Sequence, residues 1–272
     1  MTGLRRIRMK KLSRAEITGY TILAVWILLA VLVPLFCPWS FSEQNGEIRN
    51  QGPSLAHWFG TDKLGRDLFA RVWYGAGISL FIGAVSAGIN GGIGIVYGAV
   101  AGYLGKRTDM LLMRAADIID SIPSMLYVIL ISQAAGSGPG SIILGLCVSG
   151  WIGMARTVRG EILRLKTTDF AAAAKMERIP GYRILLRHLL PNAAGPIAVN
   201  FLFLIPQAVF TEAFLSFLGV GLEAPAASLG TIIQEARSQM LLYPYQMIWP
   251  LVVLCAMMLA LNGVATAMEK RQ

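Results

Sequence analysis

Long runs of apolar residues follow one another along the chain, with shorter polar segments between them. An α-helix needs roughly 20 consecutive apolar residues to cross the hydrocarbon core of a bilayer. The pattern predicts about six transmembrane helices, at residues 17–36, 78–104, 110–135, 141–158, 193–220 and 247–268. We therefore predict an all-α integral membrane protein that forms a single transmembrane domain over residues 1–272.

Two of these runs are less regular than the others. Asp117, Asp120 and Pro123 interrupt the third run, and the fourth is short unless it extends to residue 158. Two connections are longer than simple turns. They are a loop over residues 37–77 and a second loop over residues 156–190.

Composition supports a membrane protein. Hydrophobic residues make up 55% of the chain and charged residues only 14%, against about a quarter in soluble domains. The 29 glycines suit close packing of transmembrane helices. Three widely spaced cysteines argue against a disulfide framework or a zinc site, so we predict no metal site.

The basic residues predict the orientation in the membrane. The chain has 24 lysines and arginines. If the N-terminus is cytoplasmic, 19 of them fall in inner segments and five in outer segments, as the positive-inside rule requires. Both termini are then predicted to be cytoplasmic, with loop 37–77 outside and loop 156–190 inside. This distribution also favours a membrane protein over a nucleic-acid-binding one, so the expected surroundings are a lipid bilayer and no nucleic acid.

The inner loop has the pattern of a helix, a turn and a second helix. Asp169 is a good N-cap for the alanine-rich segment that follows it. Pro180 and Gly181 favour a turn before the second helix. A short helix with small side chains suits docking into a groove of a partner protein. The alternative is an amphipathic helix that lies on the lipid surface.

Three segments of the chain resemble one family of membrane proteins. Residues 57–67 read HWFGTDKLGRD and are followed by YGAGISL at residues 74–80. The inner loop reads DFAAAAK from residue 169 and ends in RHLLPN at residue 192, and the fifth run leaves through EAFLSFLGVG at residues 212–221. In these segments the chain resembles the inner-membrane permeases of dipeptide, oligopeptide and nickel ABC importers, of the second-permease type.

The resemblance implies a fold and a set of partners. The fold is the type I ABC importer permease fold, with a cytoplasmic coupling helix between the fourth and fifth spans. The implied partners are a second homologous permease, two cytoplasmic ATPases and an extracytoplasmic binding protein, in the inner or plasma membrane of a prokaryotic cell. ATP and magnesium belong to the partner subunits, and this chain is expected to bind no cofactor. Small peptides are the first choice of cargo, with nickel or another chelated metal next.

The coupling helix is carried over from the family onto specific residues of the inner loop. These residues are Asp169, Phe170, Ala173, Ala174, Arg178 and Gly181. Ala172 stands where the family usually has glutamate, and Arg178 stands where it usually has glycine. The Pro180-Gly181 pair can supply the turn that the missing glycine would have made.

Polar residues inside the apolar runs are candidates for a translocation pathway. Asn200 and Gln207 are seven residues apart, so they share one face of the fifth helix, where they either line a pathway or bond to a neighbouring helix. Glu212 either lines the pathway or pairs with an outer-loop arginine such as Arg66 or Arg71. Asp120 either attracts a cationic cargo or, with Asp117, pairs with an arginine or caps a helix.

Arg66 and Asp67 are candidates on the outer side of the membrane. They lie in the segment that resembles the family and are predicted either to contact the binding protein or to form a structural ion pair that fixes the loop.

Other functions have less support in the sequence. The chain has no G-x-x-x-x-G-K-[ST] motif and no H-E-x-x-H motif, which argues against ATP hydrolysis or intramembrane proteolysis by this chain. An ion-coupled secondary transporter that uses Glu212, Asp117 and Asp120 is the main alternative. Such folds often contain inverted repeats, and the sequence shows none. A passive channel is a third alternative, but nothing resembles a filter motif.

Overall fold

The computed structural model describes residues 14–168 and 179–271. In this part of the chain the regular elements are helices, and one isolated β-bridge joins Thr61 to Asp67. The longer elements are the helices α1 (Arg14–Phe36), α2 (Leu68–Leu104), α3 (Lys106–Asp120), α4 (Ser124–Ala135), α5 (Pro139–Ser149), α6 (Ile152–Lys166), α9 (Leu190–Phe217), α10 (Leu229–Arg237) and α11 (Tyr245–Glu269). The shorter elements are a 3-10 turn (Gly46–Ile48), α8 (Gly181–Ile184) and a π-helical turn (Leu185–Leu189).

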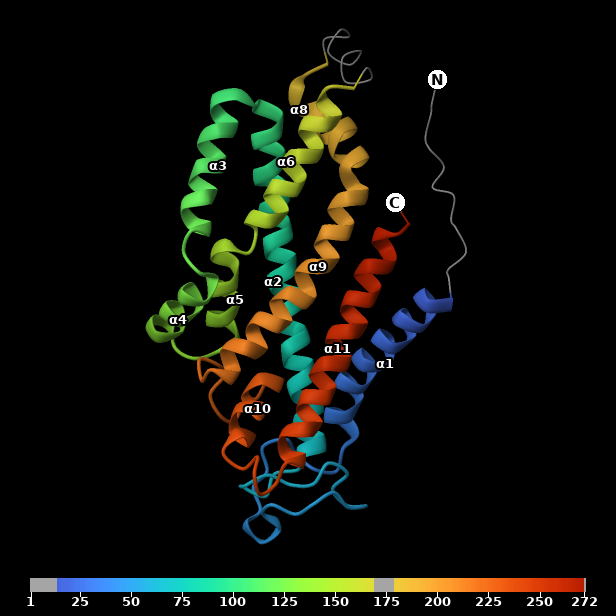
Figure 1. Ribbon diagram of the computed structural model, residues 1–272, viewed down its shortest axis with the longest axis vertical. Coiled ribbons are helices and arrows are strands. Elements are labelled where there is room, and N and C mark those ends of the chain that lie inside the picture. Colours follow the sequence, from blue (N-terminus) through green and yellow to red (C-terminus); the bar gives the residue numbers. More distant parts are fainter. Residues whose placement is uncertain (1–13, 169–178, 272) are drawn as a thin grey trace.

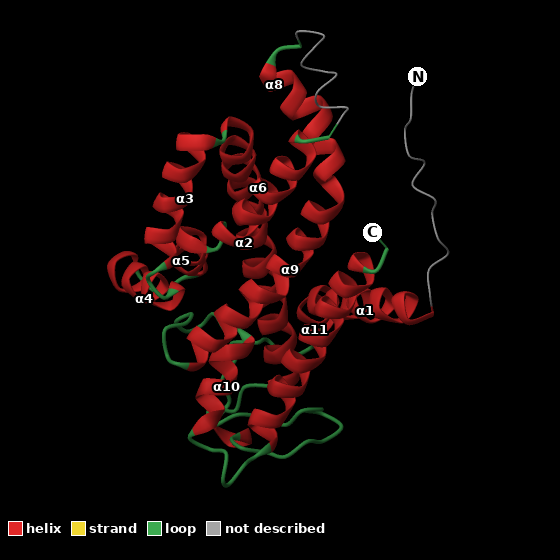
Figure 2. Cartoon of the chain, turned by 45° about the horizontal axis from the view of Figure 1, so that its top comes forward, coloured by secondary structure: helices red, strands yellow, loops and turns green. Residues whose placement is uncertain are grey.

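Helix α2 forms the centre of the molecule. It packs most extensively against α6 and α9 and also contacts α1, α3, α5, α10 and α11. Figures 1 and 2 show α3, α4 and α5 on one side of this centre and α1 and α11 on the other. Five helical segments are long and apolar enough to cross a membrane, or six if α3 and α4 together form one bent span. The chain is thus a multi-pass membrane protein, as predicted.

Three glycines bring α2 into direct contact with the backbone of α6. A Cβ atom at Gly94, Gly98 or Gly102 would lie 2.7, 2.3 or 2.9 Å from the carbonyl oxygen of Trp151, Ala155 or Arg159, respectively. The contacts repeat every four residues on both helices, which is the small-residue spacing of closely packed transmembrane helices. A side chain at any of these three glycine positions would push the two helices apart.

The second span begins earlier than predicted. Helix α2 starts at Leu68 rather than at residue 78, so the outer loop covers residues 37–67 and not 37–77. Asp67 caps the helix by accepting a hydrogen bond from the Ala70 amide, 2.7 Å away. The first turns carry Arg71 and are buried by other parts of the protein rather than by lipid, so hydropathy does not detect them.

The inner loop is shorter than the predicted range of 156–190. Helix α6 continues to Lys166, and a continuous helical segment runs from Gly181 to Phe217 through the π-helical turn. The second helix of the loop and the fifth span are therefore one helical segment, and Pro191 does not interrupt it. In the π-helical turn the Leu190 amide bonds to the Leu185 carbonyl, five residues back instead of four.

The third span is two helices rather than one. Helices α3 and α4 meet at a bend of 69° at residues 121–123, where Pro123 precedes the first residue of α4.

Helix α10 was not predicted at all. It begins with a capping box between Ser228 and Thr231, which differs from the usual pattern because threonine replaces glutamate or glutamine.

The two ends of the molecule carry different kinds of structure. Figure 1 shows the 37–67 loop and α10 at one end, and the α2–α3 turn, α8 and the end of α11 towards the other. This arrangement agrees with the predicted alternation of the spans. Which end faces the cytoplasm remains a prediction.

The glycine contact between α2 and α6 is testable by adding one methyl group. Gly98→Ala is expected to destabilise the fold by about 1–3 kcal/mol, the usual cost of overpacking a close contact. Gly88→Ala is the matched control, because a Cβ at Gly88 in the same helix meets nothing within 4 Å. Thermal unfolding of the detergent-solubilised protein measures both variants. Equal melting temperatures for the two would contradict the close contact.

Candidate functional site

A polar cavity of about 300 Å³ lies between α2, the α3–α4 bend, the α5–α6 junction and α9. Most other hollows of the described chain are apolar, so this lining is unusual for the protein. Its most polar lining residues are Asn90, Asp120, Arg156, Asn200, Gln207 and Thr211.

The junction between α5 and α6 makes room for this cavity. Gly150 and Gly153 line it, and a Cβ at Gly150 would lie 2.5 Å from the amide nitrogen of Asn90. Asn90 is 4% exposed and donates one long hydrogen bond, of 3.4 Å, to the Leu146 carbonyl. Its side-chain oxygen accepts no hydrogen bond from any residue that the structure describes.

Three of the four residues predicted for the pathway meet at this cavity. Asp120 comes from the end of α3, and Asn200 and Gln207 come from one face of α9, as their spacing predicted. The Asn200 amide also donates a hydrogen bond of 3.1 Å to the Thr157 hydroxyl of α6. Asn200 thus both lines the cavity and ties α9 to α6.

Glu212 does not belong to this cavity. Its side chain is fully buried and accepts hydrogen bonds from the hydroxyls of Ser79 and Ser216, at 2.7 and 2.8 Å. The predicted pairing with Arg66 or Arg71 is wrong, because both arginines pair with other carboxylates. Its partner Ser79 lies on α2, and nothing in the sequence indicated that contact.

The predicted pairing of Asp117 and Asp120 with an arginine is confirmed. Arg156 of α6 lies 2.9 Å from Asp117 and 2.8 Å from Asp120, measured between guanidinium nitrogen and carboxylate oxygen. A second ion pair, between Arg159 and Asp109, joins the same two helices. Arg156 was counted as part of the inner loop in the sequence, but it belongs to the helix that forms the cavity wall.

The outer loop is fixed by buried polar contacts. His57 and Asp67 lie 2.8 Å apart, and both side chains are almost completely buried. Arg66 lies 2.6 Å from Asp62 and also pairs with Glu235 of α10. Arg66 and Asp67 therefore take part in structural contacts of the loop, although not with each other. Their predicted contact with a binding protein stays a prediction.

Two arginines and two carboxylates make up an ionic network at the end that carries the 37–67 loop. Arg71 lies 2.8 Å from Asp62 and 3.2 Å from Glu235. Both arginines are buried. The network pairs their two positive charges with two negative ones. Burial raises the pKa of Glu235 above its ordinary value, and the Arg66 guanidinium opposes that rise. The sequence did not indicate Glu235, which lies more than 160 residues from both arginines.

The residues assigned to coupling lie mostly outside the described chain. Asp169, Phe170, Ala173, Ala174 and Arg178 fall in residues 169–178, which the structure does not describe.

Gly181 is described and begins α8. A Cβ at this position would lie 2.4 Å from the hydroxyl of Tyr103, so glycine lets α8 approach the end of α2.

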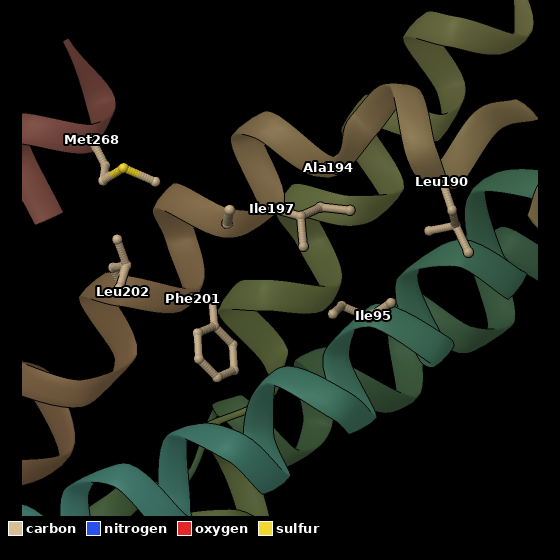
Figure 3. Close-up of a pocket in the computed structure, with 8 residues that line it drawn as sticks. Ile95, Leu190, Ala194, Ile197, Phe201, Leu202 and Met268 are labelled. Carbon is tan, nitrogen blue, oxygen red and sulfur yellow. The ribbon is translucent and has the colours of Figure 1, made fainter. Parts of the chain in front are cut away.

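Other hollows differ in character from the polar cavity. Figure 3 shows a groove between α2, α9 and α11 that is lined by apolar side chains such as Ile95, Phe201 and Met268. Its volume is about 480 Å³, and its lining suits lipid or another apolar helix surface rather than a polar ligand. Among the described residues, no group of three or more histidines, cysteines or carboxylates could hold a metal ion.

Comparisons with known proteins match the chain over most of its length. Residues 94–272 match the family model "Binding-protein-dependent transport system inner membrane component". The oligopeptide transport system permease protein OppC of Bacillus subtilis is 40% identical over 264 residues, which cover 97% of this chain and 86% of that protein. The dipeptide transport system permease protein DppC of the same organism is 45% identical over 231 residues, which cover 85% of this chain and 71% of that protein.

A solved structure shares the fold. A chain of the MetNI methionine ABC transporter, in an inward-facing conformation, superposes with a TM-score of 0.60. The alignment covers 74% of this chain and 94% of that chain at 19% identity. At this identity the likeness concerns the arrangement of helices and not the cargo.

The ionic network between the 37–67 loop, α2 and α10 is testable through its charge balance. Glu235→Gln leaves two buried guanidiniums with one carboxylate and is expected to lower the free energy of unfolding by about 1–3 kcal/mol. Glu223→Gln is the control, because Glu223 is an exposed glutamate in the connection between α9 and α10. Thermal melting of the purified protein separates the two variants. A Glu235→Gln variant as stable as the control would show that the network contributes nothing.

Proposed function

Because the chain belongs to the family of inner-membrane components of binding-protein-dependent transport systems, we propose that it carries small peptides across the membrane. The chain is a permease subunit of an ABC importer and not a catalytic subunit. The polar cavity between α2, α3, α6 and α9 carries the proposal, because it is a site for a polar cargo inside an apolar helical protein.

Peptides fit this cavity better than other cargo classes. Side-chain amides of Asn90, Asn200 and Gln207 both donate and accept hydrogen bonds, as peptide groups do. Two relatives are named as oligopeptide and dipeptide permeases, which supports peptides over the nickel that the sequence resemblance also allowed.

The family works with ATPase and substrate-binding partners in general. For this chain we propose one homologous permease as the second half of the pathway, two cytoplasmic ATPases and one extracytoplasmic binding protein. ATP and magnesium would be held by the ATPases, and this chain would bind neither. Both termini would be cytoplasmic, which the distribution of lysine and arginine supports.

The structure suggests how an ATPase would move the cavity. Helices α6 and α8 flank the segment that resembles a coupling helix, at residues 167–180. Helix α6 carries Arg156, and the continuous helix that begins with α8 carries Asn200. The hydrogen bond between Asn200 and Thr157 joins these two helices. A displacement of the segment would therefore move two walls of the cavity together and change access to it.

The ion-coupled alternative is not supported. The relatives are permeases of binding-protein-dependent systems, and Glu212, which was to serve as its proton relay, lies outside the polar cavity. Its hydrogen bonds to Ser79 and Ser216 fix it between α2 and α9.

Co-purification and the energy source of uptake test the proposal. The full chain, expressed with the neighbouring genes of its operon, is expected to bring a second permease and ATPases with it. In proteoliposomes that contain the binding protein, uptake of trialanine is expected to require enclosed ATP and to persist when an ionophore collapses the proton gradient. A P-loop lysine variant of the partner ATPase is the control. Uptake that follows the ion gradient without ATP would contradict the proposal.

A further inference from the structure

We propose that Arg156 binds the terminal carboxylate of the transported peptide, in exchange for the carboxylates that hold it in this structure. This inference rests on the proposed function, because it assigns the recognition of cargo to one side chain of the same cavity. It also predicts a preference of the permease itself for peptides with a free carboxyl terminus.

Arg156 is placed for such an exchange. Among the described residues, it is the one lysine or arginine that lines the cavity. Its guanidinium contacts Asp117 and Asp120 at 2.9 and 2.8 Å, and about half of each of the three side chains is exposed. Exposed ion pairs of this kind contribute little net free energy. An exchange therefore breaks only a weak pair, and the displaced aspartate, about half exposed, is left to solvent. The planar guanidinium suits bidentate binding of the incoming carboxylate.

Asn90 supplies an independent sign of a ligand. Its side chain is 4% exposed and lines the same cavity, and its oxygen accepts no hydrogen bond within the described residues. A buried acceptor without a donor is costly, so such groups usually have a partner. A peptide amide can donate this hydrogen bond.

The size and remaining lining of the cavity agree with a short peptide. Its volume of about 300 Å³ is at the lower end of the range for small-ligand pockets. Asn200, Gln207 and Thr211 of α9 line the same cavity and offer further donors and acceptors. The cavity thus provides one cation, already shared with Asp120 of the same lining, and neutral polar groups for peptide bonds.

The experiment compares two cargoes that differ only at the carboxyl terminus. Trialanine and trialanine amide are each supplied to proteoliposomes that contain the complete importer with its binding protein. The measured quantity is the ratio of their ATP-dependent uptake rates. Because the same binding protein serves every permease variant, its own preference cancels when the ratios are compared. If the binding protein does not bind trialanine amide, a second assay replaces uptake. It measures the ATPase activity that millimolar peptide stimulates in the importer without binding protein.

The wild-type importer is expected to favour the free acid, and Arg156→Gln is expected to lower the ratio about tenfold, as the loss of one charge-assisted hydrogen bond would. Arg156→Lys retains the charge without the planar fork and is expected to lower the ratio less. Arg164→Gln is the matched control, because Arg164 is also an ion-paired arginine of α6 but does not line the cavity. Its ratio is expected to equal that of the wild type.

The possible outcomes separate this inference from the proposed function. If the wild-type importer takes up neither peptide with ATP, the proposed function fails. If it takes up peptide but the ratio is the same in Arg156→Gln and the wild type, only the role of Arg156 fails. Co-purification of the partners shows whether each variant assembles. Should Arg156→Gln not assemble, an unchanged ratio in Arg156→Lys would overturn the inference.

Discussion

The close approach of α2 to α6 is the contact on which the rest of the structure depends. Inside a bilayer, apolar side chains gain little by leaving lipid for another apolar helix, so packing between helices has to come from close surface contact. Gly94, Gly98 and Gly102 allow this contact by exposing the backbone of α2 to carbonyl groups of α6. The central helix then supports α9 on another face, and α3 reaches α6 through the ion pairs of Arg156 and Arg159.

Polar groups inside this apolar structure fall into two kinds with different consequences. Glu212 is buried, accepts hydrogen bonds from Ser79 of α2 and from Ser216 of its own helix, and does not line the polar cavity, so it ties α9 to α2. Asn90, Arg156 and Asn200 border a shared hollow, and Asn90 retains an acceptor that no described residue uses. Satisfied groups stabilise a membrane protein, whereas accessible and incompletely paired groups can exchange partners with a cargo. Burial alone does not separate these kinds; hydrogen-bond partners do.

The two ends of the molecule differ in how they are built. At one end, the ion pairs of Arg66 and Arg71 with Asp62 and Glu235 bind the 37–67 loop to α10 and produce a firmly structured surface. Towards the other end, α6 and the long helix that starts at Gly181 flank a short segment and continue into the cavity walls. Under the proposed function, a partner that moved this segment would act on the cavity through two helices.

The sequence by itself determined the membrane class, the approximate positions of the spans, their alternation and the family resemblance, because hydropathy, basic residues and local motifs are properties of neighbouring residues. It also placed Asn200 and Gln207 on one helix face, since helical spacing is local. Only the tertiary structure decided that Asp120 joins them, that Glu212 does not, and that Asn90 and Arg156 complete the cavity. It also decided the early start of α2, whose first turns are covered by protein instead of lipid, and the partner of Arg66 on α10, more than 160 residues away. These features depend on which helices meet, and that is set by packing between segments distant in the sequence.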